Sequence, residues 1–364
     1  MLEYNANCWR CFINKHIKKY NNLDFVSKVD FSIHDYIKKP LIIKNLRLPN
    51  RLALAPLAGT TETVFRSICR EMGVGLVTTE LVSARGIYHD PSLKKNYQYL
   101  EINPEKENPV AIQLFGHCPN DFRRSVEIIL EHSVLQQCAM IDINMGCPVK
   151  KVVKEGAGSA LMKKPQLASD IVKTVVEVAK DYDKPVSVKL RSGWDEETKN
   201  APDFAIKMQE AGADLITIHG RSREQFYSGL ADWTIIKQVV DAVDIPVYGN
   251  GDLVDLQSIK KMYDETNCSG FVIGRAAQGN PWIFREIING NGLMNKEEWL
   301  DMIKRHVNDR LLKEKDEGST IIKMRKQFSN YLKGKKNAAQ IRKKVMTCES
   351  KDELFKILDK IEIS

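Results

Sequence analysis

The sequence lacks any long hydrophobic run. No stretch of its 364 residues approaches the roughly 18 consecutive apolar residues that a membrane-spanning helix needs. The first residues also lack the layout of a signal peptide, because Asn, Lys and His interrupt their apolar side chains. Hydrophobic residues make up 43% of the chain and charged residues 28%, as in an ordinary globular protein. We therefore expect a cytoplasmic protein that does not bind membranes, with a monomer as the default oligomeric state.

A complete metal-binding motif is missing as well. The eight cysteines are scattered along the chain, and in a reducing compartment such thiols are mostly small buried side chains. Cys8 and Cys11 have the spacing of half a zinc site, but no second Cys or Cys/His pair follows to complete it. We expect no bound metal. Residues 1–40 show no sustained hydrophobic period, and the role of this N-terminal extension is open.

The third absence is local and concerns acidic residues. Between Lys323 and Lys344 there is no Asp or Glu, although the window holds nine Lys and Arg in a chain of net charge +8. A solvated helical face is one interpretation of such a run. Because Phe328 and Tyr331 are interleaved with the cations, the pattern also favours binding to a polyanion such as RNA.

From Leu41 onward the chain alternates short apolar runs with amphipathic helical stretches. The apolar runs predict eight strands: Leu52–Ala55, Leu76–Thr79, Val110–Leu114, Met140–Asn144, Pro185–Lys189, Leu215–His219, Pro246–Gly249 and Gly270–Ile273. Eight strands separated by helices over about 240 residues predict an α/β fold, a parallel (β/α)₈ TIM barrel, rather than an open sheet. The least regular part is Arg85–Asn108, where no helix is clear.

The pattern changes after about Asn291, where four successive helical stretches predict a small all-α C-terminal domain. We therefore divide the chain into the extension at 1–40, the barrel at 41–290 and a helical domain at 291–364. Polar residues recur just past the predicted strands of the barrel, at the end where TIM barrels place their active sites. The most distinctive of them is Cys147, which follows a strand and stands between Gly146 and Pro148. Cysteines that serve only for packing are more usual within the apolar strand than on its exit loop.

Several motifs together resemble the tRNA-dihydrouridine synthase family, and the resemblance runs from about Leu41 to the mid-340s. The motifs that carry it are Ala55–Gly59 with Phe65-Arg66, Asn144–Met162, Lys189–Trp194, His219–Arg221, Asn250–Asp252 and Gly274-Arg275. The resemblance implies reduction of uridines in tRNA to dihydrouridine. It implies flavin mononucleotide (FMN) as cofactor, NADPH as the source of electrons, and Cys147 as the acid that protonates carbon 5 of uracil.

The resemblance and the residue types also indicate binding residues. The expected cofactor-binding residues are Pro56, Leu57, Ala58, Gln113, Lys189, His219, Asn250, Gly251, Asp252, Gly274 and Arg275. Glycine N–H groups and an arginine suit the flavin phosphate, whereas the carboxylate of Asp252 would repel it, so we expect structural bonds from Asp252. Asn144 and Arg191 carry donors for the uracil carbonyls, and Arg325 and Lys326 belong to the basic surface expected to bind tRNA.

Two other functions remain open at this point. A flavin barrel acting on a free pyrimidine, like dihydroorotate dehydrogenase, would use related chemistry but would have no evident use for a basic tail. A tRNA-binding factor that has lost catalysis would not need Cys147.

Two residues depart from the family pattern, namely Leu57 where Met is usual and Gln327 where His is common. The uridine that is modified and the choice between NADPH and NADH are not indicated.

Overall fold

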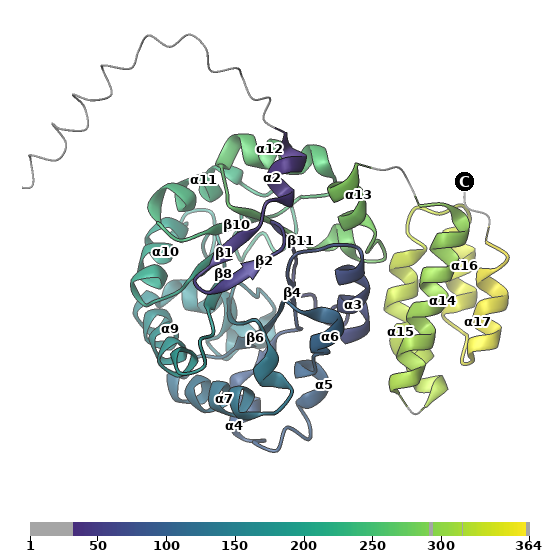
Figure 1. Cartoon of the computed structure of the whole chain (residues 1–364), viewed down its shortest axis with the longest axis horizontal. Helices are drawn as coiled ribbons and strands as arrows, with labels where there is room; N and C mark the ends of the chain where they lie inside the picture. The colour runs from purple at the N-terminus through teal and green to yellow at the C-terminus, as the bar shows by residue number, and fades with distance from the viewer. Residues whose placement is uncertain (1–31, 291–293, 315, 362–364) are drawn as a thin grey trace, which may run out of the picture.

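A computed structural model of the protein describes residues 32–290, 294–314 and 316–361, and Cys8 and Cys11 lie outside these residues. Eight parallel strands form a barrel around which helices are arranged (Figure 1). The strands are β3 (Leu52–Leu54), β4 (Val77–Thr78), β6 (Val110–Phe115), β7 (Met140–Met145), β8 (Val186–Arg191), β9 (Leu215–His219), β10 (Val247–Asn250) and β11 (Gly270–Ile273). The ring closes between β3 and β4, where Leu54 N donates to Leu76 O at 2.9 Å. The predicted TIM barrel is confirmed.

Each helix of the outer layer buries its apolar face against the strands. The outer helices are α3 (Thr63–Glu71), α7 (Pro119–Glu131), α9 (Pro165–Lys180), α10 (Ala201–Glu210), α11 (Trp233–Ala242), α12 (Leu256–Thr266) and α13 (Ile283–Asn289). Their starts follow from local chemistry. The side chains of Glu62, Asp232 and Asp255 accept backbone N–H groups at the first turns of α3, α11 and α12. Proline opens α7 and α9, where the missing N–H costs nothing.

The irregular stretch after β4 contains short elements, which is why no helical period was visible in the sequence. They are β5 (Val82–Ser83), α4 (Ala84–Tyr88), α5 (Tyr97–Leu100) and α6 (Pro104–Glu107). The buried guanidinium of Arg66 connects this stretch to α3. Its Nε lies 2.8 Å from Glu107 Oε2, and its Nη2 donates to Glu101 O at 2.6 Å. A buried ion pair with additional hydrogen bonds thus connects these short elements to α3.

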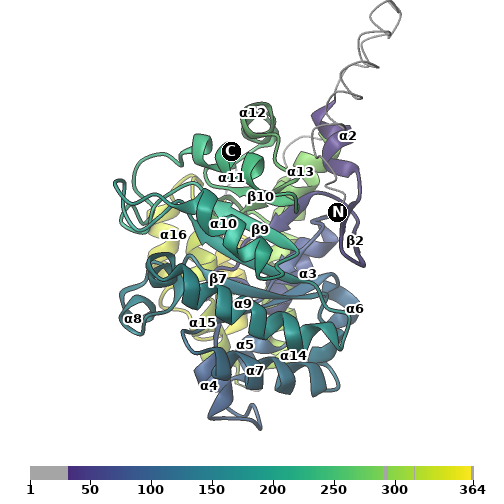
Figure 2. The ribbon, with the colours of Figure 1, turned by 90° about the vertical axis from the view of Figure 1, so that its left-hand side faces the viewer.

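A hairpin that the sequence did not predict closes the amino-terminal end of the barrel. It consists of β1 (Leu41–Ile43) and β2 (Leu46–Leu48), and its apolar side chains pack against Met140, Leu215 and Tyr248 inside the barrel. Figure 2 shows β2 at one end of the barrel and α8 (Lys150–Lys154), which follows Cys147, at the other. Helix α2 (Ile33–Lys38) lies within the predicted extension, and its Tyr36 hydroxyl donates to Cys268 O at 3.0 Å. The end of the extension therefore packs on the barrel.

The described residues of the C-terminal region form four helices, α14 (Lys296–Lys313), α15 (Glu317–Tyr331), α16 (Ala338–Val345) and α17 (Lys351–Leu358). They lie beside α3 at one side of the barrel (Figure 1). Trp299, Ile303, Phe328 and Leu354 belong to the apolar core between them, and Ile68 of α3 joins this core. The predicted all-α region is therefore confirmed, and it is packed directly on the barrel. Among the described residues no helix is both long and apolar enough to cross a membrane.

Candidate active site

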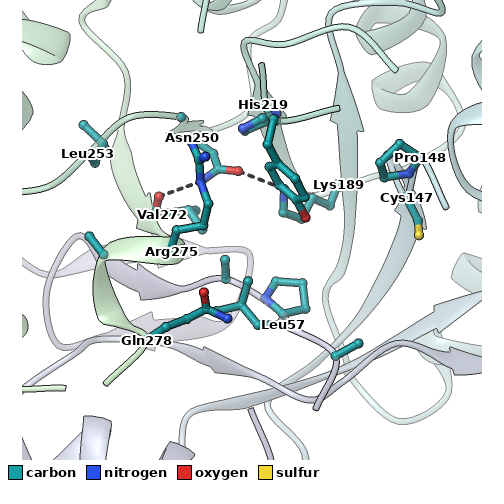
Figure 3. A pocket seen from close by; sticks show the side chains of 18 of the residues that line it. Leu57, Cys147, Pro148, Lys189, His219, Asn250, Leu253, Val272, Arg275 and Gln278 are labelled. Carbon is teal, nitrogen blue, oxygen red and sulfur yellow. Dashed lines mark hydrogen bonds between the residues drawn. The ribbon is translucent and has the colours of Figure 1, made fainter. Parts of the chain in front are cut away.

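The carboxyl ends of the strands surround a cavity of about 630 Å³, a volume typical of small-molecule sites (Figure 3). All but two of the residues predicted for the site line it. These residues are Pro56, Leu57, Ala58, Asn144, Cys147, Lys189, Arg191, His219, Asn250, Gly251, Asp252, Gly274, Arg275 and Lys326. Cys147 and Pro148 lie on the opposite side of the cavity from Arg275 and Leu253 (Figure 3). The parallel strands thus bring together side chains that are up to 270 residues apart in sequence, from Pro56 to Lys326.

Cys147 is held on a rigid turn after β7. Its backbone N–H donates to Asn144 Oδ1 at 2.9 Å, and its carbonyl accepts the Ser159 hydroxyl at 2.9 Å. Gly158 has a φ of +60°, and a Cβ there would lie 2.8 Å from Cys147 O, so only glycine fits below the turn. Burial raises the pKa of the Cys147 thiol, although a backbone N–H and the charges of Arg191 and Lys189 act in the other direction. The thiol is therefore protonated at neutral pH and can act as an acid.

Lys189 and His219 both line the floor of the cavity, where the lysine is charged and the histidine is neutral. Burial and the charge of Arg191 lower the pKa of Lys189 to about 8, so the amine is mostly protonated at pH 7. Its Nζ donates to Asn250 Oδ1 at 3.1 Å. Burial and the surrounding cations lower the pKa of His219 well below its ordinary value, which keeps the imidazole neutral. His219 Nδ1 is buried and has no hydrogen-bond partner among the described residues.

Asp252 accepts hydrogen bonds from two arginines and a backbone N–H at one wall of the cavity. Its carboxylate accepts Arg221 Nη2 at 2.8 Å and Arg275 Nη2 at 3.0 Å, and it also accepts the backbone N–H of Ala231. Arg275 is about half exposed at the cavity wall, whereas Arg221 is buried. The preceding residue, Gly251, has a φ of +127°, and a Cβ there would lie 2.6 Å from that of Ala231. This turn therefore requires glycine.

Arg191 lines the cavity, but two of the three guanidinium nitrogens, Nε and Nη1, donate to backbone carbonyls of the surrounding loops. Its Nε donates to Gly146 O at 2.9 Å, and its Nη1 donates to Ser222 O at 2.7 Å and Phe226 O at 2.9 Å. Burial lowers the pKa of Arg191 to about 10, so it remains charged at neutral pH. Nη2 takes part in none of these three bonds. The predicted contact of Arg191 with a uracil carbonyl stays a prediction that Nη2 could satisfy.

The C-terminal helices supply part of the cavity wall, and Lys333 lines it together with Lys326. Lys326 Nζ donates to Ala58 O at 2.6 Å, and the neighbouring Gln327 donates to Thr60 O at 3.0 Å. The two helical residues thus fix the loop after β3. Arg325 is one of the two predicted residues outside the cavity. Its Nη2 contacts Cys348 O at 3.3 Å within the helical region, so its expected role in binding RNA stays a prediction.

Gln113 is the other predicted residue that does not line the cavity. It is fully buried one layer below, where it connects Asn144 to Asp142. Sequence reasoning missed Asp142 and Ser187, which lie beneath the site. The only available signal was that both residues are polar within otherwise apolar strands. The expected contact of Gln113 with the cofactor remains a prediction.

A comparison of the sequence with known families gives one match over most of the chain. The profile described as Dihydrouridine synthase (Dus) matches residues 53–363. The chain belongs to the dihydrouridine synthase family. The match starts within the barrel and includes the four C-terminal helices. It therefore begins later and ends later than the predicted resemblance, which ran from about Leu41 to the mid-340s.

Curated relatives of the chain carry names that agree with this family. The "Probable tRNA-dihydrouridine synthase 1" of Synechocystis sp. is 42% identical over 250 residues, which are 68% of this chain and 67% of that protein. The "Probable tRNA-dihydrouridine synthase" of Rickettsia conorii is 36% identical over 82% of this chain and 89% of its own length. The "tRNA-dihydrouridine synthase B" of Pseudomonas aeruginosa is 38% identical over 66% of this chain and 69% of its own.

Solved structures share the barrel at low sequence identity. A 2-naphthoyl-CoA reductase complex superposes with a TM-score of 0.55 at 13% identity, over 71% of this chain and 53% of that one. An old yellow enzyme homologue from Zymomonas mobilis superposes with a TM-score of 0.51 at 13% identity, over 72% of this chain and 96% of that one. At such identities these comparisons support the fold alone.

Membership of the family implies a flavin cofactor, and the cavity of this protein fits one. Five cations line it, namely Lys189, Arg191, Arg275, Lys326 and Lys333, against the single carboxylate of Asp252, which is already paired. Such a surplus of positive charge suits an anionic ligand. His219, whose Nδ1 has no hydrogen-bond partner in the part of the chain that the structure describes, offers a further polar contact at the cavity wall. The cationic side chains of the cavity therefore suit the phosphate of a cofactor, and its polar side chains suit a ring system that carries polar atoms.

Proposed function

We propose that this protein reduces uridines of tRNA to dihydrouridine, with FMN bound at the barrel mouth and Cys147 as the proton donor. The family membership and the names of the curated relatives support this reaction. The observation that carries the mechanism is the position of Cys147 at the cavity wall, across from Arg275 (Figure 3). Burial raises the pKa of its thiol, which favours the protonated form that an acid needs. A reduction of this kind needs an acid on one side of the base and an electron donor on the other.

The cofactor would be held by the residues that line the cationic half of the cavity. Arg275 and the backbone of Gly251 and Gly274 would meet its phosphate, since TIM barrels commonly bind phosphate after strands seven and eight. Lys189 and His219 would contact the ring system from the floor. When bound and reduced, the flavin supplies the hydride that carbon 6 of uracil accepts. We infer NADPH as the source of electrons from the family resemblance.

Cys147 completes the reduction from the other side. Its Sγ–H bond breaks as the proton passes to carbon 5 of uracil, and the thiolate that remains takes up a proton from solvent. Asn144, which holds the backbone of Cys147, and Arg191 border the same part of the cavity. We assign both residues to the uracil carbonyls, because each carries N–H donors. The charge of Arg191 would stabilise negative charge that develops on a carbonyl oxygen.

The helical region would bring the RNA to this cavity. A uridine within folded tRNA must leave its stack to reach a barrel mouth, and flipping costs a few kcal/mol. Contacts with phosphates elsewhere offset that cost and make binding salt-dependent. Lys326 and Lys333 line the cavity and are exposed, so the basic surface of the helices is continuous with the site. A reaction on tRNA agrees with the expected cytoplasmic location, and a monomer is the proposed state.

The absorbance of the flavin tests the proposed function under anaerobic conditions. The protein is loaded with FMN, reduced by NADPH and mixed with tRNA that lacks dihydrouridine. We expect rapid reoxidation by this tRNA and not by free uridine or by fully modified tRNA. Reoxidation by a free pyrimidine alone would instead support an enzyme like dihydroorotate dehydrogenase. A protein that binds tRNA but takes up no flavin would be a binding factor without catalysis.

A further inference from the structure

A continuous chain of hydrogen bonds runs from the middle of the barrel to Cys147. Ser187 Oγ donates to Asp142 Oδ1 at 2.6 Å, and Gln113 Nε2 donates to Asp142 Oδ2 at 2.5 Å. Asn144 Nδ2 then donates to Gln113 Oε1 at 2.8 Å. Finally, Asn144 Oδ1 accepts the backbone N–H of Cys147 at 2.9 Å and that of Gly146 at 3.2 Å.

The strand register places these side chains side by side inside the barrel. Gln113 of β6 is paired with Asp142 of β7, and Asp142 is paired with Ser187 of β8. Asn144 follows Asp142 by two residues and therefore points to the same, inner side of the sheet. Gln113 is 0% exposed, Ser187 2% and Asp142 5%. Solvent thus cannot replace the bond between Asp142 and Gln113 or the bond between Gln113 and Asn144 if either is lost.

The groups at the two ends of this series of hydrogen bonds fix which amide atom donates and which accepts. At the inner end, burial raises the pKa of Asp142, while the hydrogen bonds from Ser187 and Gln113 and the charge of Lys189 act in the other direction. As a carboxylate, Asp142 can only accept, so Gln113 must turn its NH₂ group toward it. The oxygen of Gln113 then faces Asn144, which must in turn present its own NH₂ group. At the outer end, two backbone N–H groups require the oxygen of Asn144. Both ends therefore select the same orientation of both amides.

We propose that Asp142 is a positioning residue for the proton donor, because its carboxylate orients Gln113 and, through Asn144, holds the turn that carries Cys147. This inference rests on the proposed role of Cys147 as the acid. Amide groups do not titrate near neutral pH, so the chain cannot pass protons to the thiol, and its effect is one of geometry. Displacements of about 1 Å in an active site can lower a rate by about 100-fold.

A second role for Asp142 would be to compensate the charge of Lys189, and substitution by asparagine separates the two roles. Asp142→Asn removes the charge but keeps the shape, and its oxygen can accept from Gln113. The Ser187 hydroxyl can rotate to accept the new NH₂ group, since Met140 Sδ lies 3.8 Å away as an alternative acceptor. Asp142→Ala leaves Gln113 Nε2 without a partner. Ser187→Ala is the matched control, because it removes one bond to Asp142 and leaves the bond to Gln113.

Two measurements on the flavin-loaded protein test the proposal. The first is the rate at which iodoacetamide alkylates Cys147, followed on the peptide that contains it by mass spectrometry. The second is steady-state reduction of tRNA. For Asp142→Ala we expect several-fold faster alkylation, because the turn loosens. We also expect kcat about tenfold lower, the effect of weakening one buried hydrogen bond, with an unchanged KM for tRNA. Asp142→Asn and Ser187→Ala should resemble the wild type in both measurements.

Any other pattern would overturn the proposal. An Asp142→Asn variant as impaired as Asp142→Ala would show that the charge acts through Lys189. If Asp142→Ala lowers kcat without faster alkylation, or speeds alkylation without lowering kcat, Asp142 does not act on the reaction through the position of the Cys147 thiol. If Asp142→Ala does not fold, Gln113→Met breaks the same chain one bond further out and should give the same two changes. If the wild type does not reduce tRNA, the proposed function fails, while the alkylation rates still decide whether Asp142 positions Cys147.

Discussion

The neighbouring residues Arg325 and Lys326 should differ in their effect on RNA binding. Successive residues of a helix point about 100° apart. Lys326 accordingly reaches the cavity and contacts Ala58 O, whereas Arg325 turns into the helical region toward Cys348 O. We therefore expect Lys326→Ala to remove a phosphate contact. Arg325→Ala should mainly lower the stability of the helical region, by about 1 kcal/mol for one hydrogen bond.

The magnitude for Lys326 follows from the release of counterions. One phosphate contact contributes about 0.7 to 0.9 to the slope of log K against log salt concentration. If this contribution vanishes at about 1 M salt, its loss weakens binding about five- to eightfold at about 0.1 M. Lys326→Ala should therefore show both a weaker affinity and a shallower slope, and Lys326→Arg should restore both because it keeps the charge.

Fluorescence anisotropy of labelled tRNA, titrated over a range of salt concentrations, measures both quantities. Thermal unfolding of each variant shows whether the helical region is intact. An unchanged slope for Lys326→Ala would refute the assignment of this residue to a phosphate. A slope that falls equally for Arg325→Ala would mean that the contact of Arg325 with Cys348 O does not hold it away from the RNA.

Two further predictions concern stability. Glu62 is mostly buried, with 13% of its side chain exposed. Burial raises its pKa, but the hydrogen bond and charge of His306 and the charge of Arg310 lower it, and the net result is a shift from 4.5 to about 2. Since the folded pKa is depressed, this group stabilises the fold by up to about 3 kcal/mol above pH 4.5, and the effect is lost between about pH 4.5 and 2. Urea titrations should find that Glu62→Gln lowers stability at pH 7 and flattens its dependence on acid, and equal acid dependence in both proteins would contradict the assignment. Gly251→Ala should lower Tm and flavin affinity because its Cβ would meet Ala231, whereas Gly334→Ala, also at positive φ (+78°) but in open space, should retain flavin affinity; equal losses would rule out the close contact as the cause.

The sequence predicts the barrel well, because its signal is local and repeated. Each of the eight strands is a short apolar run bounded by loop or helical sequence, and the structure has a strand at every one of these places. The hairpin at Leu41–Leu48 could not be predicted in the same way. Its strands have three residues each, which is too short for a period, and its apolar side chains are explained only by the barrel end that they cover.

The candidate site shows a similar division. Strand ends predict which residues meet at the barrel mouth, since parallel strands carry them to the same edge. The depth of a side chain is harder to predict, because it depends on the register between strands. Gln113 therefore lies one layer below the cavity, bonded to Asp142. The separation of Arg325 from Lys326 likewise depends on how α15 is rotated against the barrel, and composition does not contain that information.

The most direct test of the mechanism is a single-turnover experiment on Cys147→Ala, with flavin and tRNA binding measured in parallel. The variant should bind both ligands like the wild type, because the thiol makes neither contact in the proposed arrangement. Loss of the acid should slow reduction of the uridine by about 100- to 10,000-fold, the usual contribution of general acid catalysis. Reduction at the wild-type rate would contradict the assignment of Cys147 as the proton donor.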